Sequence, residues 1–250
     1  WISANFFSFL HPLISCSRFR ASDLLLYNEV YIILTGLFPS KDFAPIPRFC
    51  CFSLLFKSTV IPASDGGDGF LDTIYNFKPV KKVYFRSVDA FQYAIDSYYL
   101  LDVETNTAYI ELANTVGIRH LQSNELNILK TSTHGVGLQI AHALDAGVRS
   151  IYIGLGGSAS NDMALGLLEA LGFIFLDSNG ALITYSFENL SKIHSYELPN
   201  SLQKKIQNCS FFAINDVLNP LCGPLGAANI YGPQKGGSEE TILAMDGSFE

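Results

Sequence analysis

Short apolar runs that end in glycine-rich turns dominate the pattern of hydrophobic and polar positions in the second half of the chain. Residues 151–153 (Ile-Tyr-Ile) form a β-branched and aromatic run that is typical of a buried strand. Residues 173–176 and 211–214 repeat this pattern. Because such runs alternate with helical stretches, we expect an α/β fold in which all three are strands of one sheet.

Helical periodicity fills the intervals between these runs. Residues 161–171 begin with N-cap residue types, continue with strong helix formers and stop before Gly172, a typical left-handed helix end. Residues 136–146 place apolar side chains on one face, after Ser132 or Thr133 as the N-cap. We therefore expect helices over 161–171 and 136–146, both packed on the sheet.

The same alternation of strands and helices starts earlier in the chain. Residues 59–63 are typical of a strand end, and residues 64–69 (Ser-Asp-Gly-Gly-Asp-Gly) form an acidic, glycine-rich turn. Residues 70–77 then carry apolar residues at helical spacing, residues 81–101 favour strands, and residues 107–118 continue from a strand into a helix. These segments predict a sheet with a helix packed on it.

Composition separates residues 1–57 from the rest of the chain. They contain nine of the 19 Phe and one of the 20 Gly. Their five Lys/Arg and three Asp/Glu give a charge of +2, so the other residues carry −9 to reach the total of −7. The segment has neither the basic start of a signal peptide nor an apolar run long enough to span a bilayer. We expect it to be an atypical segment that packs poorly against the remainder.

Charge and cysteine usage narrow the function classes. The net charge of −7 argues against nucleic acid or an anionic membrane as the partner, because both require a basic surface. The five Cys are irregularly spaced and include no Cys-x-x-Cys pair. Neither a zinc site nor a disulfide framework is predicted, and a cytoplasmic location is the expectation.

The glycine turn after residues 151–153 is the first candidate for ligand binding, because glycine permits close approach and free N–H groups attract anions. Gly154, Gly156 and Ala159 match Gly-x-Gly-x-x-Ala. Asp177 ends the next apolar run at the spacing of a ribose-binding acid. A dinucleotide-binding oxidoreductase is therefore one interpretation. The P-loop pattern and the HRD and DFG motifs of protein kinases do not occur in the sequence.

Five motifs taken together favour another interpretation. They are SDGGDGF (64–70), TSTHGVG (131–137), GLGGSASNDMALG (154–166), NDVLNPLCG (215–223) and YGPQKGG (231–237). In this order they resemble the motifs of the bacterial type of glycerate kinase, which look like ADGGEGT, TSYGVGE, GIGGSATNDGG, DVTNPLCG and FGPQKG. The resemblance extends from residue 59 to about residue 240.

This resemblance implies a kinase that transfers a phosphoryl group from ATP to D-glycerate with Mg²⁺, in a cleft between two α/β domains. Residues 1–57 then match no part of the family. Residues 58–80 are a remnant of a flavodoxin-like outer domain, and residues 81–250 are the inserted domain that carries the glycine-rich motifs. The expected partners are D-glycerate and ATP, whereas a homodimer and the choice between 2- and 3-phosphoglycerate stay open.

The matching positions imply three groups of site residues. The expected catalytic residues are Asp65, Asp216 and Lys235, and Asp65 and Asp68 are the expected metal ligands. Phosphoryl transfer needs such carboxylates and cations together with N–H donors for phosphate. The residues expected to bind phosphate or the glycerate carboxylate are Gly156, Gly157, Ser158, Asn161, Asp162 and Asn219.

The chain also departs from the family pattern. No DSFKGS-like loop precedes residue 58, and no GEGxxDxQ-like segment follows the last motif. Met163 and Ala164 stand where the family has a glycine pair, and Phe70 replaces a small Thr. We expect the loss of the glycine pair to favour the helix and Phe70 to crowd the site. A fragment without catalytic activity is therefore a third interpretation.

Overall fold

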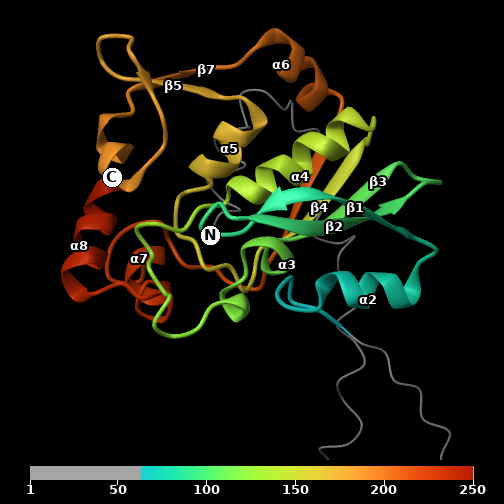
Figure 1. The fold of residues 1–250 in the computed structure, drawn as a ribbon, viewed down its shortest axis with the longest axis horizontal. Coiled ribbons are helices and arrows are strands. Elements are labelled where there is room, and N and C mark those ends of the chain that lie inside the picture. Colours follow the sequence, from blue (N-terminus) through green and yellow to red (C-terminus); the bar gives the residue numbers. More distant parts are fainter. Residues whose placement is uncertain (1–62, 250) are drawn as a thin grey trace, which may run out of the picture. The chain divides into compact units, whose positions relative to one another are not determined.

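The computed structural model describes residues 63–249, which contain a five-stranded mixed sheet with helices on both faces (Figure 1). The strand order is β1-β2-β3-β4-β8. β1, β2 and β3 pair antiparallel, whereas β3, β4 and β8 pair parallel. The strands are β1 (Lys81–Val88), β2 (Ala94–Asp102), β3 (Thr107–Glu111), β4 (Ser150–Gly154) and β8 (Ser210–Ile214). The predicted α/β fold class is confirmed.

Successive side chains of a strand point to opposite faces, and two cores result. On one face Tyr109 of β3 packs with Phe70 and Leu71 of helix α2 (Phe70–Phe77). On the other face the next residue, Ile110, belongs to the larger core, and three of the helices that contribute to this core lie within residues 112–171. These helices are α3 (Leu112–Val116), α4 (His134–Asp145) and α5 (Leu165–Leu171).

A second, three-stranded sheet in the order β6-β5-β7 corrects one prediction. Its strands are β5 (Ile174–Leu176), β6 (Leu182–Ile183) and β7 (Ser195–Glu197). The expectation that residues 173–176 share a sheet with 151–153 and 211–214 is wrong. β4 is paired on both sides, by β3 and β8, so only the outer edges of β1 and β8 remain open in the large sheet. β5 pairs antiparallel with its neighbours along the chain instead.

The prediction for α5 is also corrected. The helix begins at Leu165 rather than near residue 161, because Met163 and Ala164 have left-handed backbone conformations with φ of 53° and 63°. The exchange of the glycine pair therefore does not favour the helix. The end of α5 is confirmed, since Gly172 follows it with φ of 104°. A glycine adopts this conformation without steric cost.

Most other local predictions are confirmed. α2 covers residues 70–77, β1 and β2 lie within 81–102, and β3 leads directly into α3. α4 begins two residues before the predicted start, with Thr133 at the N-cap position. The predicted strand end at 59–63 and the atypical segment 1–57 fall almost entirely outside the described residues.

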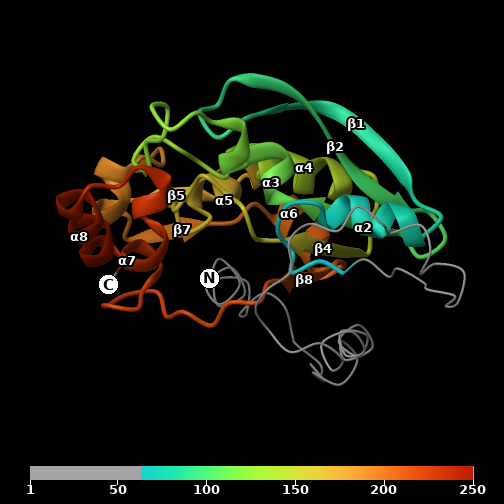
Figure 2. The same ribbon diagram turned by 90° about the horizontal axis from the view of Figure 1, so that it is seen from below.

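Helices α7 (Ala227–Tyr231) and α8 (Glu239–Ser248) lie side by side, at the end of the described unit away from α2 (Figure 2). Across residues 63–249 no helix has the length and apolar character that a membrane span requires. The remaining elements are η2 (Ile118–His120), η3 (Phe187–Lys192), α6 (Asn200–Gln207) and η4 (Pro233–Lys235).

Candidate functional site

A cavity of about 350 Å³ lies where the parallel strands β4 and β8 end. Ligands of α/β sheets typically bind at the carboxyl ends of the strands. Four segments that are distant in sequence meet at this cavity, and each contributes residues predicted from its motif. The predicted residues in its wall are Asp65, Gly156, Gly157, Ser158, Asn161, Asp216 and Lys235.

Two glycine loops pack directly on each other at this point. The Gly156 N–H donates to the Gly66 carbonyl at 3.0 Å. A Cβ at Gly66 would lie 2.2 Å from the Ile214 carbonyl oxygen, and one at Gly156 would lie 2.6 Å from the Gly67 Cα. Because neither contact allows a side chain, glycine is what brings the loop that carries Asp65 against the turn after β4.

Asp65 is oriented by its own turn. Its Oδ1 accepts a hydrogen bond from the Gly67 N–H at 2.8 Å, the geometry of an Asx turn. The residue is exposed and lines the cavity. Asp216, which follows β8, lines the same cavity and is also exposed. Within the described part of the chain nothing hydrogen-bonds to the Asp216 carboxylate, which leaves its oxygens available to a ligand.

Lys235 is the buried cation of the cavity. It lies in η4 and is 9% exposed, and its Nζ donates to Ser158 Oγ at 3.2 Å and to the Ser160 carbonyl. Burial lowers the pKa of Lys235 to about 8, although the carboxylate of Asp162 acts in the opposite direction. Removal from water disfavours the charged amine, so an anionic ligand would stabilise its protonated form.

The loop after β8 is held from two sides. The Gly223 N–H donates to both carboxylate oxygens of Asp246 in α8, at 3.1 and 3.0 Å. Asn219 donates to the Leu225 carbonyl at 3.0 Å and accepts a hydrogen bond from the Tyr231 hydroxyl. Asn219 does not line the cavity itself, but its hydrogen-bond partner Tyr231 does.

Asp162 stands between two residues of the cavity wall, Asn161 and Met163, but is not part of that wall itself. It is 2% exposed, and its Oδ2 accepts from the Thr133 N–H at 2.7 Å and the Thr133 hydroxyl at 2.8 Å. Its Oδ1 accepts from the Ala164 N–H at 3.2 Å. Burial raises the pKa of Asp162, and the hydrogen bonds from Thr133 counteract that rise. The side chain thus joins the start of α4 to the turn before α5.

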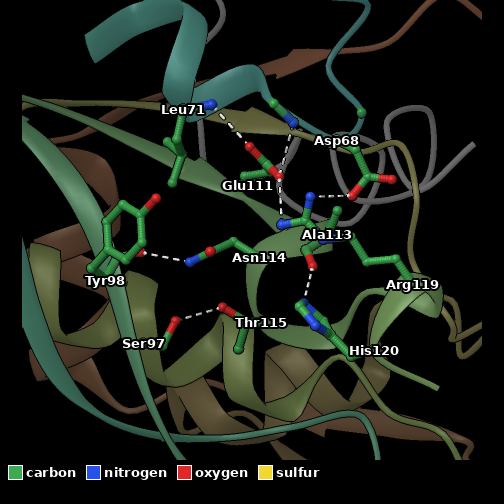
Figure 3. A network of polar contacts seen from close by, with 12 residues as sticks. Asp68, Leu71, Ser97, Tyr98, Glu111, Ala113, Asn114, Thr115, Arg119 and His120 are labelled. Atoms are coloured by element: carbon green, nitrogen blue, oxygen red, sulfur yellow. Dashed lines mark hydrogen bonds and ion pairs between the residues drawn. The ribbon is translucent and has the colours of Figure 1, made fainter.

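Asp68 faces a cation in the structure. Its carboxylate pairs with Arg119 at 3.0 Å, and both side chains are about half exposed (Figure 3). It does not line the cavity, although it lies against Gly157 of the glycine turn.

Glu111 is a residue that sequence reasoning missed. This carboxylate at the end of β3 accepts from the Leu71 N–H at 2.9 Å and the Gly69 N–H at 3.3 Å, at the start of α2 (Figure 3). Arg119 approaches it at 3.8 Å. Burial raises the pKa of Glu111, and the two backbone donors oppose this. Glu111 thereby connects the sheet to the loop that carries Asp65, across 40 residues of sequence.

Asp177 lies elsewhere. It directly follows β5 of the small sheet, and its Oδ1 accepts from the N–H groups of Asn179 and Ala181, each at 2.8 Å. These bonds, that from Ala181 above all, lower the pKa of Asp177. It is not part of the cavity wall, and α5 does not begin at the glycine turn. The geometry therefore does not support the dinucleotide-binding interpretation.

The carboxylate oxygens at the cavity are ligands of the type that Mg²⁺ prefers. Among the described residues there is no group of three or more His, Cys, Asp or Glu side chains that could hold a metal ion. Asp65 and Asp216 nevertheless line one cavity. Mg²⁺ is usually bound by one or two carboxylates together with water and substrate phosphates, so this pair fits it.

Comparison with known proteins agrees with the geometry. The glycerate kinase family model matches residues 52–250. A glycerate kinase of Bacillus cereus is 35% identical over 74% of this chain and 49% of its own length, and the glycerate 2-kinase of Escherichia coli is 30% identical over 76% and 49%. A solved glycerate kinase 2 of Salmonella typhimurium LT2 is similar with a TM-score of 0.69 and 33% identity, over 76% of this chain and 51% of that one. The chain spans about half the length of the curated relatives it matches.

Proposed function

The chain belongs to the glycerate kinase family, and we propose that its cavity is a site at which the terminal phosphoryl group of ATP is transferred to a hydroxyl of D-glycerate. One observation carries the proposal. Asp65, Asp216, Lys235 and the glycine turn at 156–158 come from separate segments and line the same cavity. Phosphoryl transfer depends on positioning and charge stabilisation, and this arrangement offers the groups for both.

The proposed reaction assigns a task to each side of the cavity. The glycerate hydroxyl oxygen attacks the terminal phosphorus, the bond to the bridging oxygen breaks, and ADP leaves with that electron pair. The hydroxyl proton passes to a carboxylate, and we assign this role to Asp216, whose oxygens have no hydrogen-bond donor among the described residues. Asp65, fixed by its Asx turn, shares the orientation of the reacting groups.

Lys235 and the glycine turn form the anion-binding side. The Nζ of Lys235 and the backbone at Gly156 and Gly157 would hold phosphate oxygens or the glycerate carboxylate, with Ser158 and Asn161 beside them. Asp65 and Asp216 would hold Mg²⁺, which neutralises charge on the transferring phosphates when bound. Asp68 pairs with Arg119, so a metal-binding role for it stays a prediction.

The proposed setting is cytoplasmic, supported by the irregular spacing of the five Cys. A homodimer and the lack of nucleic-acid or membrane partners stay predictions from the sequence.

Two matched substitutions test the proposed function. We expect the whole chain to release ADP in a D-glycerate-dependent manner, and Asp216→Asn to lower kcat about 100-fold or more, the effect of losing a general base. Thermal unfolding should be nearly unchanged, because Asp216 is exposed. The control is Asp177→Asn, which should leave turnover intact. Oxidation of a hydroxy acid with NAD, abolished by Asp177→Asn, would instead establish the dinucleotide-binding interpretation.

A further inference from the structure

Two consecutive residues next to the cavity have backbone conformations that are sterically unfavourable for any residue with a Cβ. Met163 and Ala164 have φ of 53° and 63°, in the left-handed region where a Cβ crowds the following carbonyl. The two other such non-glycine residues described, Gln92 and Asn106, lie in exposed turns between antiparallel strands. Strain of this kind persists only where the surroundings impose it, and it gathers at functional sites.

Buried hydrogen bonds impose the conformation at 163–164. Asp162 Oδ1 accepts from the Ala164 N–H at 3.2 Å, while its Oδ2 is held by Thr133. The Leu165 N–H donates to the Asp162 carbonyl at 2.9 Å and starts α5. Because both ends of this turn are tied to α4 and α5, residues 163 and 164 cannot relax into a right-handed helical turn.

The two strained residues differ in what their side chains do. Ala164 is fully buried and belongs to the main core, so its methyl group contributes packing. Met163 is only partly buried and lines the cavity between Asn161 and the start of α5. A glycine at 163 would remove the strain but would also remove this part of the wall.

We propose that Met163 is a specificity-determining residue, whose side chain narrows the cavity to short hydroxy acids of three carbons. The proposal rests on the proposed function. Asp216, Lys235 and the glycine turn supply charge and hydrogen bonds, and these groups serve any hydroxy acid equally. Discrimination by length requires an apolar wall. Ile118, Leu155 and Val217 contribute to such a wall, and Met163 is the apolar lining residue that is held in a strained, left-handed conformation. A hydrophobic wall distinguishes one carbon by about 10- to 200-fold.

The experiment compares four proteins with two acids. The unaltered chain, Met163→Gly, Met163→Leu and Ala164→Gly are tested by calorimetry for binding of D-glycerate and of D-erythronate, which is one carbon longer. We expect the unaltered chain to prefer D-glycerate at least 10-fold and Met163→Gly to reduce this preference about 10-fold. Met163→Leu keeps an apolar side chain of similar size and should keep the preference.

Ala164→Gly is the control for the backbone. Like Met163→Gly, it removes one strained residue, but it leaves the Met163 side chain in the cavity wall. Only Met163→Gly should change the preference between the acids. Equal binding of both acids to the unaltered chain, or a preference that Met163→Gly leaves intact, would overturn the inference alone. If neither acid binds any of the four proteins, the proposed function fails and the inference with it.

Discussion

Two sets of carboxylates in this molecule have opposite surroundings. Asp162 and Glu111 are buried, and each accepts hydrogen bonds from backbone N–H groups of another segment. Asp65 and Asp216 are exposed at the cavity and have at most a donor from their own turn among the described residues. The first pair holds chain segments together, whereas the second pair has coordination capacity left for a ligand. Position in a motif does not distinguish the two, since Asp162 and Asp216 both belong to motifs.

The largest effect that would test this contrast is expected at Asp162. Asp162→Ala leaves buried donors of Thr133 and Ala164 without an acceptor, at about 1–3 kcal/mol each, so we expect a loss of about 3–5 kcal/mol in the free energy of unfolding. Urea denaturation measures it. Asp162→Asn retains one acceptor oxygen and should lose clearly less. A stable Asp162→Ala protein without D-glycerate binding would move Asp162 into the ligand-binding set.

Glu111 should follow with a smaller loss. Glu111→Ala removes the acceptor for the Leu71 and Gly69 N–H groups, and we expect about 2–3 kcal/mol less stability. Asp72 is the matched control. It is also a carboxylate near the N-terminus of α2, the helix start that donates to Glu111, but it is exposed. Asp72→Ala should cost about 0.3–1 kcal/mol through the helix dipole alone. Equal losses in the two variants would show that burial of Glu111 contributes nothing.

The protonation of Lys235 predicts how activity and stability depend on pH. The pKa of Lys235 is lowered to about 8, so in the ligand-free protein its ammonium group loses its proton above that pH. We therefore expect kcat/KM to fall about 10-fold for each further pH unit. Stability changes in the opposite direction. An unfolded lysine titrates near 10.4, so between about pH 8 and pH 10 the unfolded state binds more protons and the folded state gains stability as pH rises. Lys235→Met should lower activity and remove both dependences.

The smallest effect is expected for the exposed pair of Asp68 and Arg119. Asp68→Asn should cost about 0.2–1 kcal/mol, and less at high salt, because both side chains are about half exposed. Arg119→Gln should cost more than Asp68→Asn, because Arg119 also lies 3.8 Å from the buried carboxylate of Glu111. A marked rise in the Mg²⁺ concentration needed for turnover in Asp68→Asn, but not in Arg119→Gln, would place Asp68 with the ligand-binding carboxylates.

Local pattern predicted the elements whose form depends on neighbouring residues. Helical spacing in 70–77 and the glycine at 172 were sufficient for α2 and for the end of α5. The pairing of β5 was not predictable, because it depends on which strand edges are free. The left-handed turn at 163–164 was missed for a similar reason, since distant groups at Asp162 and Thr133 impose it on good helix formers.

Predictions for the site followed the same division. Four of the five motifs contribute residues to the cavity, and the structure brings Asp65, Asp216 and Lys235 together there. No local signal marks Glu111, because its partners lie 40 residues earlier and follow from the pairing of the sheet with α2. Sequence alone likewise could not separate the buried Asp162 from the exposed Asp216.

The mixed sheet has a consequence for the order in which the chain folds. Short turns at 89–93 and 103–106 connect β1, β2 and β3, whereas residues 112–149 and 155–209 separate the parallel strands β3, β4 and β8. Closing longer loops costs more entropy, so we expect the antiparallel hairpins to form before the parallel pairs. Pulse-labelled hydrogen exchange during refolding should protect amides of 94–102 before those of 210–214. The cavity, built where the parallel strands end, would then be among the last parts of the molecule to form.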